Sequence, residues 1–233
     1  MRGSGASQAM TLSIIVPVRN EAVILPALLA RLLSLQRTGC EILLVDGGSE
    51  DGSIAMIDCA GFEVVHAPAG RARQMNAGAA RAGGEILLFL HADTELPHGA
   101  LDCVNQALVG GVHHWGRFNV RISGQHWMLR VIGHMMNLRS RLTGIATGDQ
   151  ALFMTRAVFD AVGGFPDQAL MEDIELSKHL RCRSRPACIS RCVTTSGRRW
   201  ETRGVWSTMV LMWRLRWDYW RGVPSDQLAR AYR

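Results

Sequence analysis

Three apolar runs of strand length in the first part of the chain each lead to a carboxylate. The runs begin at residues 12, 41 and 85, and the carboxylates that follow belong to Glu21, Asp46 and Asp93. Continuous apolar runs are typical of strands buried on both faces of a parallel sheet, and α/β sheets bind ligands at the carboxyl ends of their strands. The pattern therefore predicts three carboxylates at one sheet edge, an arrangement suited to a nucleotide and a divalent metal.

Segments whose pattern is typical of helices alternate with these apolar runs. Leucines recur at helical intervals over residues 22–35, with Pro26 in the first turn, where proline is tolerated. Residues 52–60 and 70–82 also read as helices, the second rich in small residues that permit close packing, and residues 62–66 read as a third strand. The alternation predicts parallel strands joined by right-handed crossovers.

The second half of the chain is less regular. Its pattern predicts extended segments at 116–122 and 151–154, a loop at 144–149, and helices at 126–142, 155–162 and 171–181. We expect one domain over residues 11–204, preceded by a disordered head or tag remnant at 1–10. Residues 205–233 are rich in tryptophan and arginine, and we expect them to form a C-terminal helix that packs on the domain or on a partner, or lies on a membrane surface. Packing is favoured, since the tryptophans form no clean stripe.

Composition narrows the class of protein. The chain has 233 residues, 48% hydrophobic and 20% charged, as in soluble globular proteins. Its formal charge of +6 comes almost wholly from arginine, which suits phosphates or an anionic membrane surface. Nucleic acid is disfavoured because there is no basic helix and no aromatic RNA-binding motif. No apolar run is long enough to span a bilayer, so we expect a cytoplasmic protein, with the inner membrane face as an alternative.

The six cysteines are scattered, which argues against a disulfide framework in a chain of this size. Three of them, Cys182, Cys188 and Cys192, lie near His179, but their spacing matches no compact zinc pattern. We expect small buried thiols.

The ordered set of short motifs resembles a known family. The motifs are Val16-Pro17-Val18-Arg19-Asn20-Glu21, Asp46-Gly47-Gly48-Ser49, Gly70-Arg71, His91-Ala92-Asp93, Gly163-Gly164-Phe165, Glu172-Asp173 and Arg198-Arg199-Trp200. Together they resemble a family-2 glycosyltransferase with the GT-A fold, and the Gly148-Asp149-Gln150 loop resembles a small bacterial subgroup labelled selenodomain-associated transferases. The resemblance implies an α/β, Rossmann-type, mostly parallel sheet flanked by helices in a single domain.

The resemblance also implies roles on the donor side. Asp46 matches the acid that reads the nucleotide base, and Glu21 the acid near the ribose, within the motif that contains Pro17 and Arg19. Asp46 could instead be only a turn residue before Gly-Gly. Arg71 falls where relatives often carry a basic residue. It and Arg73 could meet phosphate oxygens near a helix N-terminus, although Arg73 fits a solvated first turn equally well.

The implied metal site departs from the family pattern. Asp93 matches the last acid of the metal-binding DxD motif, where Mn²⁺ or Mg²⁺ would bridge the two phosphates. His91 stands in place of the first acid. Its imidazole could ligate the metal, hold water beside it, or only pack at the strand end.

On the acceptor side, Glu172-Asp173 matches an acidic pair in which the aspartate is the general base. Acids at a helix start are also favoured by the helix dipole, but that does not account for the Gly-Gly-Phe at the family's distance. Arg199 and Trp200 resemble an element that borders the acceptor and the diphosphate, and Asp149 and Gln150 belong to the same expected region.

These implications describe an inverting, metal-dependent, hexosyltransferase-like enzyme. It would move a sugar from a nucleotide-diphosphate sugar, with a UDP-sugar as the first guess, to an unidentified acceptor hydroxyl. A nucleotidyltransferase and a degenerate nucleotide-binding scaffold are the alternatives, and a homodimer is one possible assembly. A dinucleotide dehydrogenase is disfavoured, since no Gly-x-Gly-x-x-Gly follows a strand.

Overall fold

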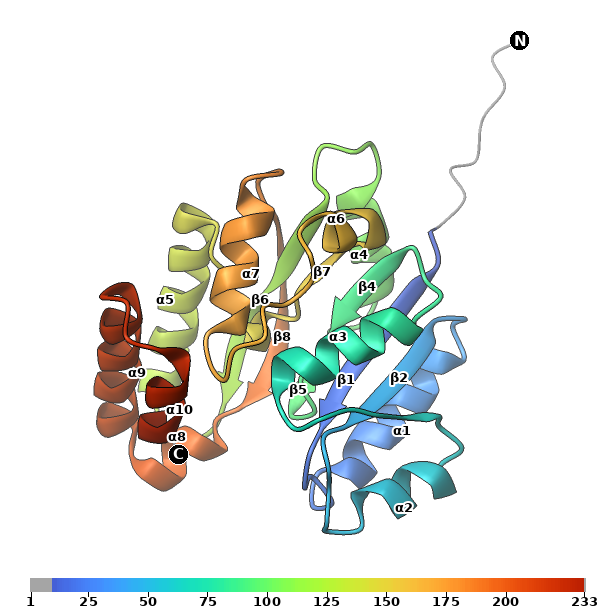
Figure 1. Ribbon diagram of the computed structural model, residues 1–233, viewed down its shortest axis with the longest axis horizontal. Helices are drawn as coiled ribbons and strands as arrows, with labels where there is room; N and C mark the ends of the chain where they lie inside the picture. The colour runs from blue at the N-terminus through green and yellow to red at the C-terminus, as the bar shows by residue number, and fades with distance from the viewer. Residues whose placement is uncertain (1–9, 233) are drawn as a thin grey trace.

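The apolar runs form one half of an eight-stranded sheet, as the computed structural model of the protein shows for residues 10–232 (Figure 1). The sheet has the order β3-β2-β1-β4-β7-β6-β8-β5. The strands are β1 (Leu12–Val18), β2 (Glu41–Asp46), β3 (Val64–His66), β4 (Ile86–Phe89), β5 (Thr94–Glu95), β6 (Trp115–Ser123), β7 (Phe153–Thr155) and β8 (Ala187–Ser196). The head expected at 1–10 lies outside the described residues except for Met10.

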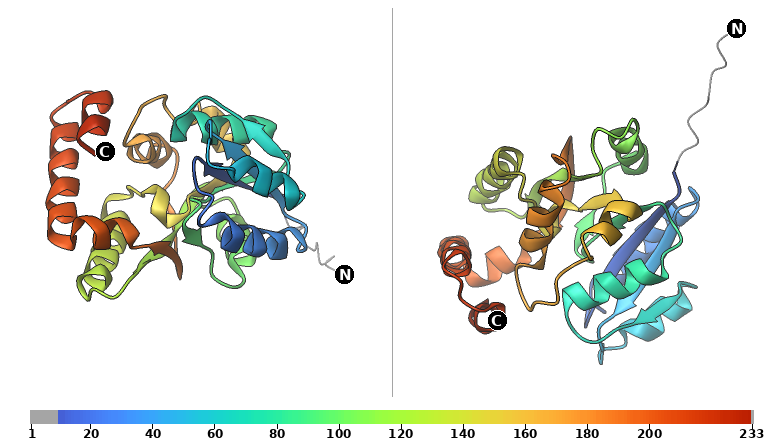
Figure 2. Two further views of the ribbon diagram at one scale, coloured as in Figure 1. Left: turned by 90° about the horizontal axis from the view of Figure 1, so that it is seen from below. Right: turned by 45° about the horizontal axis from the view of Figure 1, so that its top comes forward.

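Helices occupy both faces of this sheet and one end of it (Figures 1 and 2). They are α1 (Leu25–Gln36), α2 (Ser53–Cys59), α3 (Arg71–Arg81), α4 (Ala100–Leu108), α5 (Met128–Thr143), the 3₁₀ turn η1 (Gly148–Gln150), α6 (Arg156–Ala161), α7 (Glu172–Arg181), α8 (Arg198–Arg203), α9 (Val205–Trp220) and α10 (Ser225–Tyr232).

The predicted parallel half is confirmed. Strand β1 pairs in parallel with β2 and β4, and β2 pairs in parallel with β3. Alternate residues of β1 enter different cores: Ile14 and Val16 pack with α1, whereas Ile15 packs with α3. Burial on both faces explains why these strands read as unbroken apolar runs. A Cβ at Gly78 of α3 would lie 2.4 Å from Ile15 Cγ2, so the small-residue helix does pack closely on the sheet.

The other half of the sheet mixes directions. Strand β7 is antiparallel to both β4 and β6, while β6 and β8 run parallel with a register shift at Phe118/Asn119. The sequence pattern does not predict β8 or α4, and it predicts one C-terminal helix over 205–233 where the structure has two, α9 and α10. Strand β8 is long but mixes cysteine, arginine and threonine with few aliphatic residues, and much of it is only partly buried, so no clear two-residue period marks it.

The C-terminal helices pack on the domain through one side only. Leu215 of α9 and Leu228 of α10 are buried with Met171 and Ile174 at the start of α7. The expectation that the tryptophans form no clean stripe is wrong. Four of them share the outer side of α9, because apolar residues occupy both sides of this helix and obscure its period. Within residues 10–232, no helix combines the length and apolar character needed to cross a membrane.

The expectation of buried thiols is also wrong in part. Cys182 and Cys192 are exposed, and Cys188 is half-buried. Cys192 lies on β8 where residues 190–192 are exposed to solvent, and Cys182 follows the last turn of α7. Their positions after a helix and on the exposed part of a strand give the thiols no core to enter.

Candidate functional site

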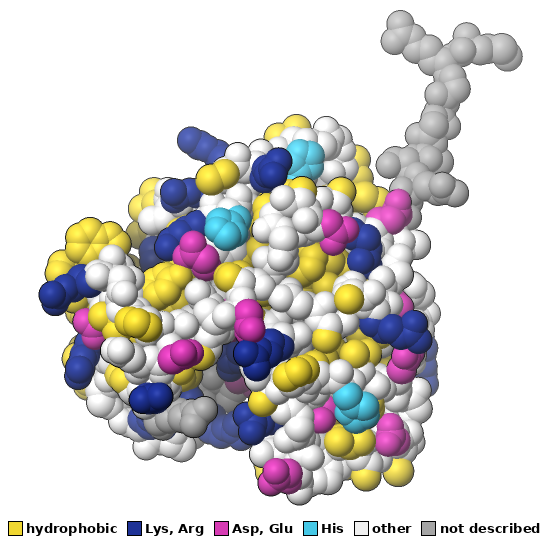
Figure 3. Space-filling view, viewed as in Figure 1, with side chains coloured by type: hydrophobic (Ala, Val, Ile, Leu, Met, Phe, Trp, Pro, Cys, Tyr) yellow, Lys and Arg dark blue, Asp and Glu magenta, His cyan; other side chains and the backbone are white. Residues whose placement is uncertain are grey.

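Two adjoining cavities lie at the carboxyl edge of the parallel strands. The larger has a volume of about 310 Å³ and the smaller about 260 Å³, and both are lined by Glu21, Arg71, His91 and Asp93. The larger also reaches α7, α8, α9 and α10. Figure 3 shows arginine side chains gathered around the indentation between the C-terminal helices and the rest of the molecule. The shared lining makes the two cavities one continuous site.

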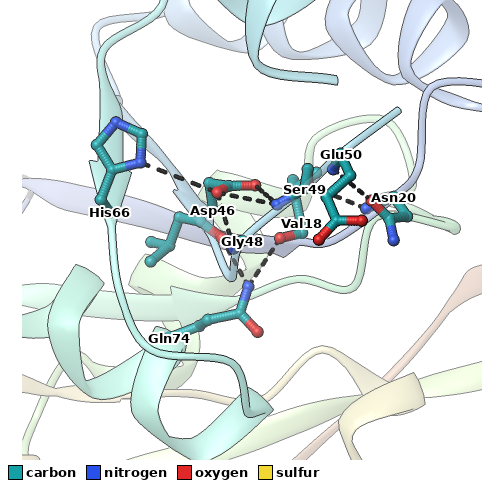
Figure 4. Close-up of polar contacts among 9 residues, drawn as sticks. Val18, Asn20, Asp46, Gly48, Ser49, Glu50, His66 and Gln74 are labelled. Carbon is teal, nitrogen blue, oxygen red and sulfur yellow. Dashed lines mark hydrogen bonds and ion pairs between the residues drawn. The ribbon is translucent and has the colours of Figure 1, made fainter. Parts of the chain in front are cut away.

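The loops that follow β1 and β2 are clamped together (Figure 4). The backbone N–H of Asn20 donates to Ser49 Oγ at 2.9 Å, and the N–H of Glu50 donates to Asn20 Oδ1 at 2.8 Å. Next along the chain, the N–H of Glu21 donates to Ser53 Oγ at 3.1 Å. These bonds fix the backbone of Glu21, whose side chain lines both cavities.

Asp46 is buried at the end of β2 and acts as a turn residue in this structure. Its carboxylate accepts the N–H of Gly48 at 2.8 Å and of Ser49 at 3.1 Å, and His66 Nδ1 lies 3.9 Å away (Figure 4). It does not line either cavity. The geometry therefore shows the turn role that the sequence left open, and the reading of a nucleotide base by Asp46 remains a prediction.

Only some of the basic residues predicted on the donor side reach the cavities. Pro17 and Arg19 line the smaller cavity, and Arg71, at the first turn of α3, lines both. Arg73 points elsewhere: its Nε donates to Asp167 Oδ1 at 2.8 Å, outside both cavities. Of the two arginines predicted near phosphate, the structure brings only Arg71 to the site.

Glu21 has a perturbed carboxyl group. Partial burial raises its pKa above the usual range, and the neighbouring Asp93 adds to the shift, while Arg198 and Arg71 partly offset it. The two carboxylates and the two guanidinium groups are thus close enough to influence one another. Asp93 itself is exposed at the junction of the cavities.

His91 is held in place by the η1 segment. Its Nδ1 lies 3.3 Å from Asp149 Oδ1, and a Cβ at Gly148 would lie only 2.3 Å from its Nε2. Burial opposes ionisation of Asp149, but its hydrogen bond with His91, and then the charges of His91 and Arg71, lower its pKa below the usual range. Only glycine fits at position 148 beside this imidazole. His91 Nδ1 faces Asp149 while the residue lines both cavities, and its role as a metal ligand remains a prediction.

Gln150 supports the same turn from behind. It is fully buried and forms a capping box with Thr147, and its Nε2 donates to Asn137 Oδ1 at 3.3 Å. It does not line the cavities. Its position indicates a structural contribution to η1 in this structure, whereas Asp149 lines the larger cavity directly.

The acidic pair opens α7 and lines the larger cavity. Asp173 accepts the N–H of Gly148 at 2.8 Å and its own helix's Ile174 N–H at 2.7 Å, so its carboxylate has a fixed orientation. Burial raises the pKa of Asp173 despite these bonds. Burial, and then the adjacent Asp173 charge, raise the pKa of Glu172, with Arg71 partly offsetting the shift. Raised pKa values make these carboxylates better proton acceptors.

Arg199 and Trp200 of α8 line the larger cavity, as does Arg198. The Arg199 guanidinium carbon lies 3.8 Å from the centre of the Tyr232 ring, which places α10 over the site. The sequence motifs do not identify the other lining residues that follow α7 in the chain. They are Thr195, Ser196, Thr208, Met212, Leu215, Arg216 and Tyr232. No local signal marks them: Thr195 and Ser196 reach the site at the end of β8, and the others reach it through the packing of α9 and α10.

Backbone strain marks the same region. Among residues 10–232, three non-glycine residues have positive φ angles: Asn20 at 55°, Ala151 at 47° and Met171 at 67°. Each is adjacent in sequence to a predicted site residue, namely Glu21, Gln150 and Glu172. Strain of this kind is often found at functional sites, where surrounding structure maintains it. A single sequence does not reveal it, because none of these residues is a glycine.

The side chains that line the site can be compared with the ligands that a divalent cation needs. No group of three or more His, Cys, Asp or Glu side chains is arranged to hold a metal ion within the described residues. Mg²⁺ is commonly bound by one or two carboxylates together with substrate phosphates. The exposed oxygens of Asp93 fit a cation held jointly by the protein and a bound diphosphate, rather than one enclosed by protein ligands.

Comparison with known proteins agrees with this fold. The family model described as "Glycosyl transferase family 2" matches residues 13–157. The undecaprenyl-phosphate 4-deoxy-4-formamido-L-arabinose transferase of Aeromonas hydrophila is 27% identical over 64% of this chain and 50% of its own length. Beta-monoglucosyldiacylglycerol synthase from Synechocystis is 24% identical over 92% of this chain and 50% of its own length. The chain thus spans half the length of these two relatives.

Solved structures share the fold at low sequence identity. The mannosyltransferase PcManGT from Pyrobaculum calidifontis, in complex with GDP-Man and Mn²⁺, has a TM-score of 0.61 at 20% identity over 81% of this chain and 57% of its own. Glucosyl-3-phosphoglycerate synthase from Mycobacterium tuberculosis, in complex with Mn²⁺ and UDP-Glc, has a TM-score of 0.59 at 17% identity over 80% of this chain and 70% of its own. The architecture is therefore the expected GT-A fold.

A third curated relative is more similar in sequence. The PGL/p-HBAD biosynthesis glycosyltransferase of Mycobacterium bovis BCG is 30% identical over 195 residues, which cover 77% of this chain and 72% of that protein. The family model matches more than half of the chain, and this relative extends the similarity beyond it. Taken with the fold, these matches establish that the chain belongs to glycosyltransferase family 2.

Proposed function

We propose that the protein transfers a sugar from a nucleotide-diphosphate sugar to an acceptor hydroxyl, with inversion at the anomeric carbon. One observation carries the proposal: a continuous site is lined on one side by Arg19, Arg71 and Asp93, and on the other by Asp173. The two arginines suit the phosphates of a nucleoside diphosphate, and the carboxylate of Asp93 suits the cation bound to them. An oriented carboxylate with a raised pKa suits proton removal.

The chemical step follows from these positions. Asp173 accepts the proton of the acceptor hydroxyl, and the hydroxyl oxygen attacks the anomeric carbon. The bond from that carbon to the phosphate oxygen breaks, and the nucleoside diphosphate leaves with the electron pair. The hydrogen bonds from Gly148 and Ile174 orient the Asp173 carboxylate, while each of its oxygens retains a lone pair for the acceptor.

The leaving diphosphate needs positive charge nearby. Arg71, Arg198 and Arg199 line the larger cavity, where they would meet phosphate oxygens. A divalent cation, Mn²⁺ or Mg²⁺, would be held by Asp93 and would neutralise charge on the diphosphate. Two structural neighbours, solved with Mn²⁺ and either GDP-Man or UDP-Glc, support a metal and leave either nucleotide base possible.

A panel of nucleotide sugars and nucleoside diphosphates, with and without Mn²⁺, tests this proposal by thermal shift. Binding stabilises the native state in proportion to the logarithm of ligand concentration. We expect one base to raise Tm in a metal-dependent manner, followed by measurable donor hydrolysis or transfer. Stabilisation by no donor in the panel would contradict the proposal, and binding without any turnover would indicate the degenerate scaffold instead.

A further inference from the structure

Helix α9 exposes a stripe of large apolar side chains. The stripe residues are separated by four, three, four and three positions, so they share one side of the helix. Their exposed fractions lie between 57% and 76%. They are Trp206, Val210, Trp213, Trp217 and Trp220. Soluble helices usually turn their apolar side inward, so this stripe needs a covering partner.

Helix α5 has a second stripe of exposed apolar side chains. Its inner side is mixed: Leu129 and Ile132 are buried in an apolar cluster, whereas Asn137 bonds both backbone groups of Val120 at 2.8 and 2.9 Å, and Gly133 packs against β6. Its outer side is apolar, with exposed fractions between 42% and 76%. The outer residues, together with the residue just before the helix, are Trp127, Val131, Met135, Leu138 and Leu142.

The two helices lie on the same side of the molecule, and all three views agree on this (Figures 1 and 2). They are in contact, since Ile132 and Met136 of α5 pack in one cluster with Val205 and Met209 of α9. The two stripes therefore belong to neighbouring helices, and we call them together the α5–α9 face. Figure 3 shows apolar side chains on the outer margin formed by α9.

Charge on the two helices is almost entirely positive. The exposed arginines of these helices are Arg130 and Arg141 on α5 and Arg214 on α9, with exposed Arg221 directly after α9, whereas Arg139 is half-buried and Arg216 lines the larger cavity. The one acid on either helix, Asp218, lies 3.6 Å from Arg214. Exposed tryptophans with arginines beside them are typical of helices that lie at a membrane surface, where the rings reach the headgroup level and the arginines meet lipid phosphates.

We propose that the α5–α9 face binds the surface of an anionic lipid bilayer. Two observations favour lipid over a second protein copy: the four exposed arginines on or directly after the two helices outnumber the acids beside them, Asp218 and Glu201, and both stripes contain tryptophan. Opposing copies of such a face would bring like charges together. The inner side of α9 lines the larger cavity through Met212, Leu215 and Arg216, so binding would hold the candidate site beside the bilayer.

Sedimentation with lipid vesicles tests the proposal without requiring activity. We expect the protein to bind vesicles of mixed phosphatidylcholine and phosphatidylglycerol, with weaker binding to phosphatidylcholine alone. The double variant Trp213→Ser/Trp217→Ser should lower the partition coefficient by about tenfold or more, since it removes two interfacial anchors. The matched control is Val23→Ser/Val112→Ser, which removes exposed apolar side chains outside this face and should bind like the native protein.

A pair of charge variants separates the effect of local contact on vesicle binding from the effect of total charge. Arg221→Glu on the face and Arg37→Glu after α1 make the same change in total charge, and both side chains are exposed. Only Arg221→Glu should weaken binding to the anionic vesicles. Equal effects of the two variants, or native binding by the tryptophan variant, would overturn the proposal. So would a solution dimer that binds no vesicle and dissociates in the tryptophan variant, because that result assigns the face to a second copy.

Discussion

The β1–β4 side of the cavity and the α7–α10 side hold their carboxylates by different means. Glu21 and Asp93 lie just after parallel strands, and their positions follow from the sheet and from the clamped loops beside it. Glu172 and Asp173 begin a helix, after Met171 in a left-handed conformation, and Asp173 depends on the distant Gly148 for orientation. The first side suits binding of a charged ligand, and the second suits proton transfer.

The electrostatics differ in the same way. On the strand side, Asp93 is exposed where a cation could reach it. On the helix side, burial raises the pKa of both Glu172 and Asp173. In the proposed function, binding and catalysis therefore fall on opposite walls of one site, and variants on each wall should give different kinetic signatures.

The largest expected effect on the chemical step alone is on the helix side. Asp173→Asn keeps the side-chain shape but removes the proton acceptor, so single-turnover transfer should fall by about 10²- to 10⁴-fold while donor affinity is retained. The matched control is Asp160→Asn, an exposed acid on α6, which should transfer at the native rate. Native transfer by the Asp173 variant would remove it as the base without affecting the fold.

The corresponding change on the strand side should affect binding first. Asp93→Ala removes the proposed protein ligand of the cation, so we expect Mn²⁺ to lose its effect on nucleoside diphosphate affinity, with turnover abolished. Calorimetric titration with and without Mn²⁺ measures this directly. Asp102→Ala, an exposed acid on α4, serves as the control and should keep the metal effect. An unchanged metal effect in the Asp93 variant would mean that the cation is held elsewhere.

The contact between the two walls can be broken at Gly148. In Gly148→Ala the new methyl group would meet His91 Nε2, and relief of the overlap should cost about 1–3 kcal/mol of stability. Chemical denaturation measures the loss. Gly83→Ala adds a methyl group whose nearest neighbours lie at 3.8–3.9 Å, and should change stability by less than about 0.5 kcal/mol. Equal stability of the two variants would show that the region around His91 is not tightly packed.

The smallest expected effect is a change in how the stability of the protein depends on pH. The native pKa of Glu172 is raised above 4.5, so its ionised form destabilises the folded state as pH rises through the native pKa, and this cost is absent below the unfolded value. Glu172→Gln removes the cost. Its Tm should exceed the native Tm at about pH 8, and the difference should shrink toward about pH 4. A difference that stays constant across this range would show that Glu172 is ionised without penalty.

How far the sequence predicts each region depends on the range of the interactions involved. The parallel half is predictable because strands buried on both faces leave continuous apolar runs, and the helix starts near Arg71 and Glu172 follow from local pattern. The position of Tyr232 over Arg199 is not predictable from the sequence, because it requires α9 and α10 to fold back on the domain. The outer stripe of α9 is hidden in the sequence because the inner side of that helix is apolar too.

The difference between local and long-range interactions also explains why some predicted site residues lie outside the cavities. Arg73 and Arg71 are two positions apart on one helix, so they point in different directions, and Arg73 pairs with Asp167. Asp46 ends its strand as predicted, but the residues after it fold their N–H groups onto its carboxylate. Which of two local roles a residue takes depends on neighbours that only the folded chain supplies.

Titration calorimetry with UDP and GDP in the presence of Mn²⁺ tests the central claim most directly, because it compares side chains inside and outside the site. We predict saturable binding of one nucleoside diphosphate by the native protein. Affinity should be weakened by about 1–3 kcal/mol in Glu21→Ala and unchanged in Arg73→Ala. Binding that is lost in Arg73→Ala and native in Glu21→Ala, or no binding of either nucleotide, would contradict the placement of the donor in this cavity.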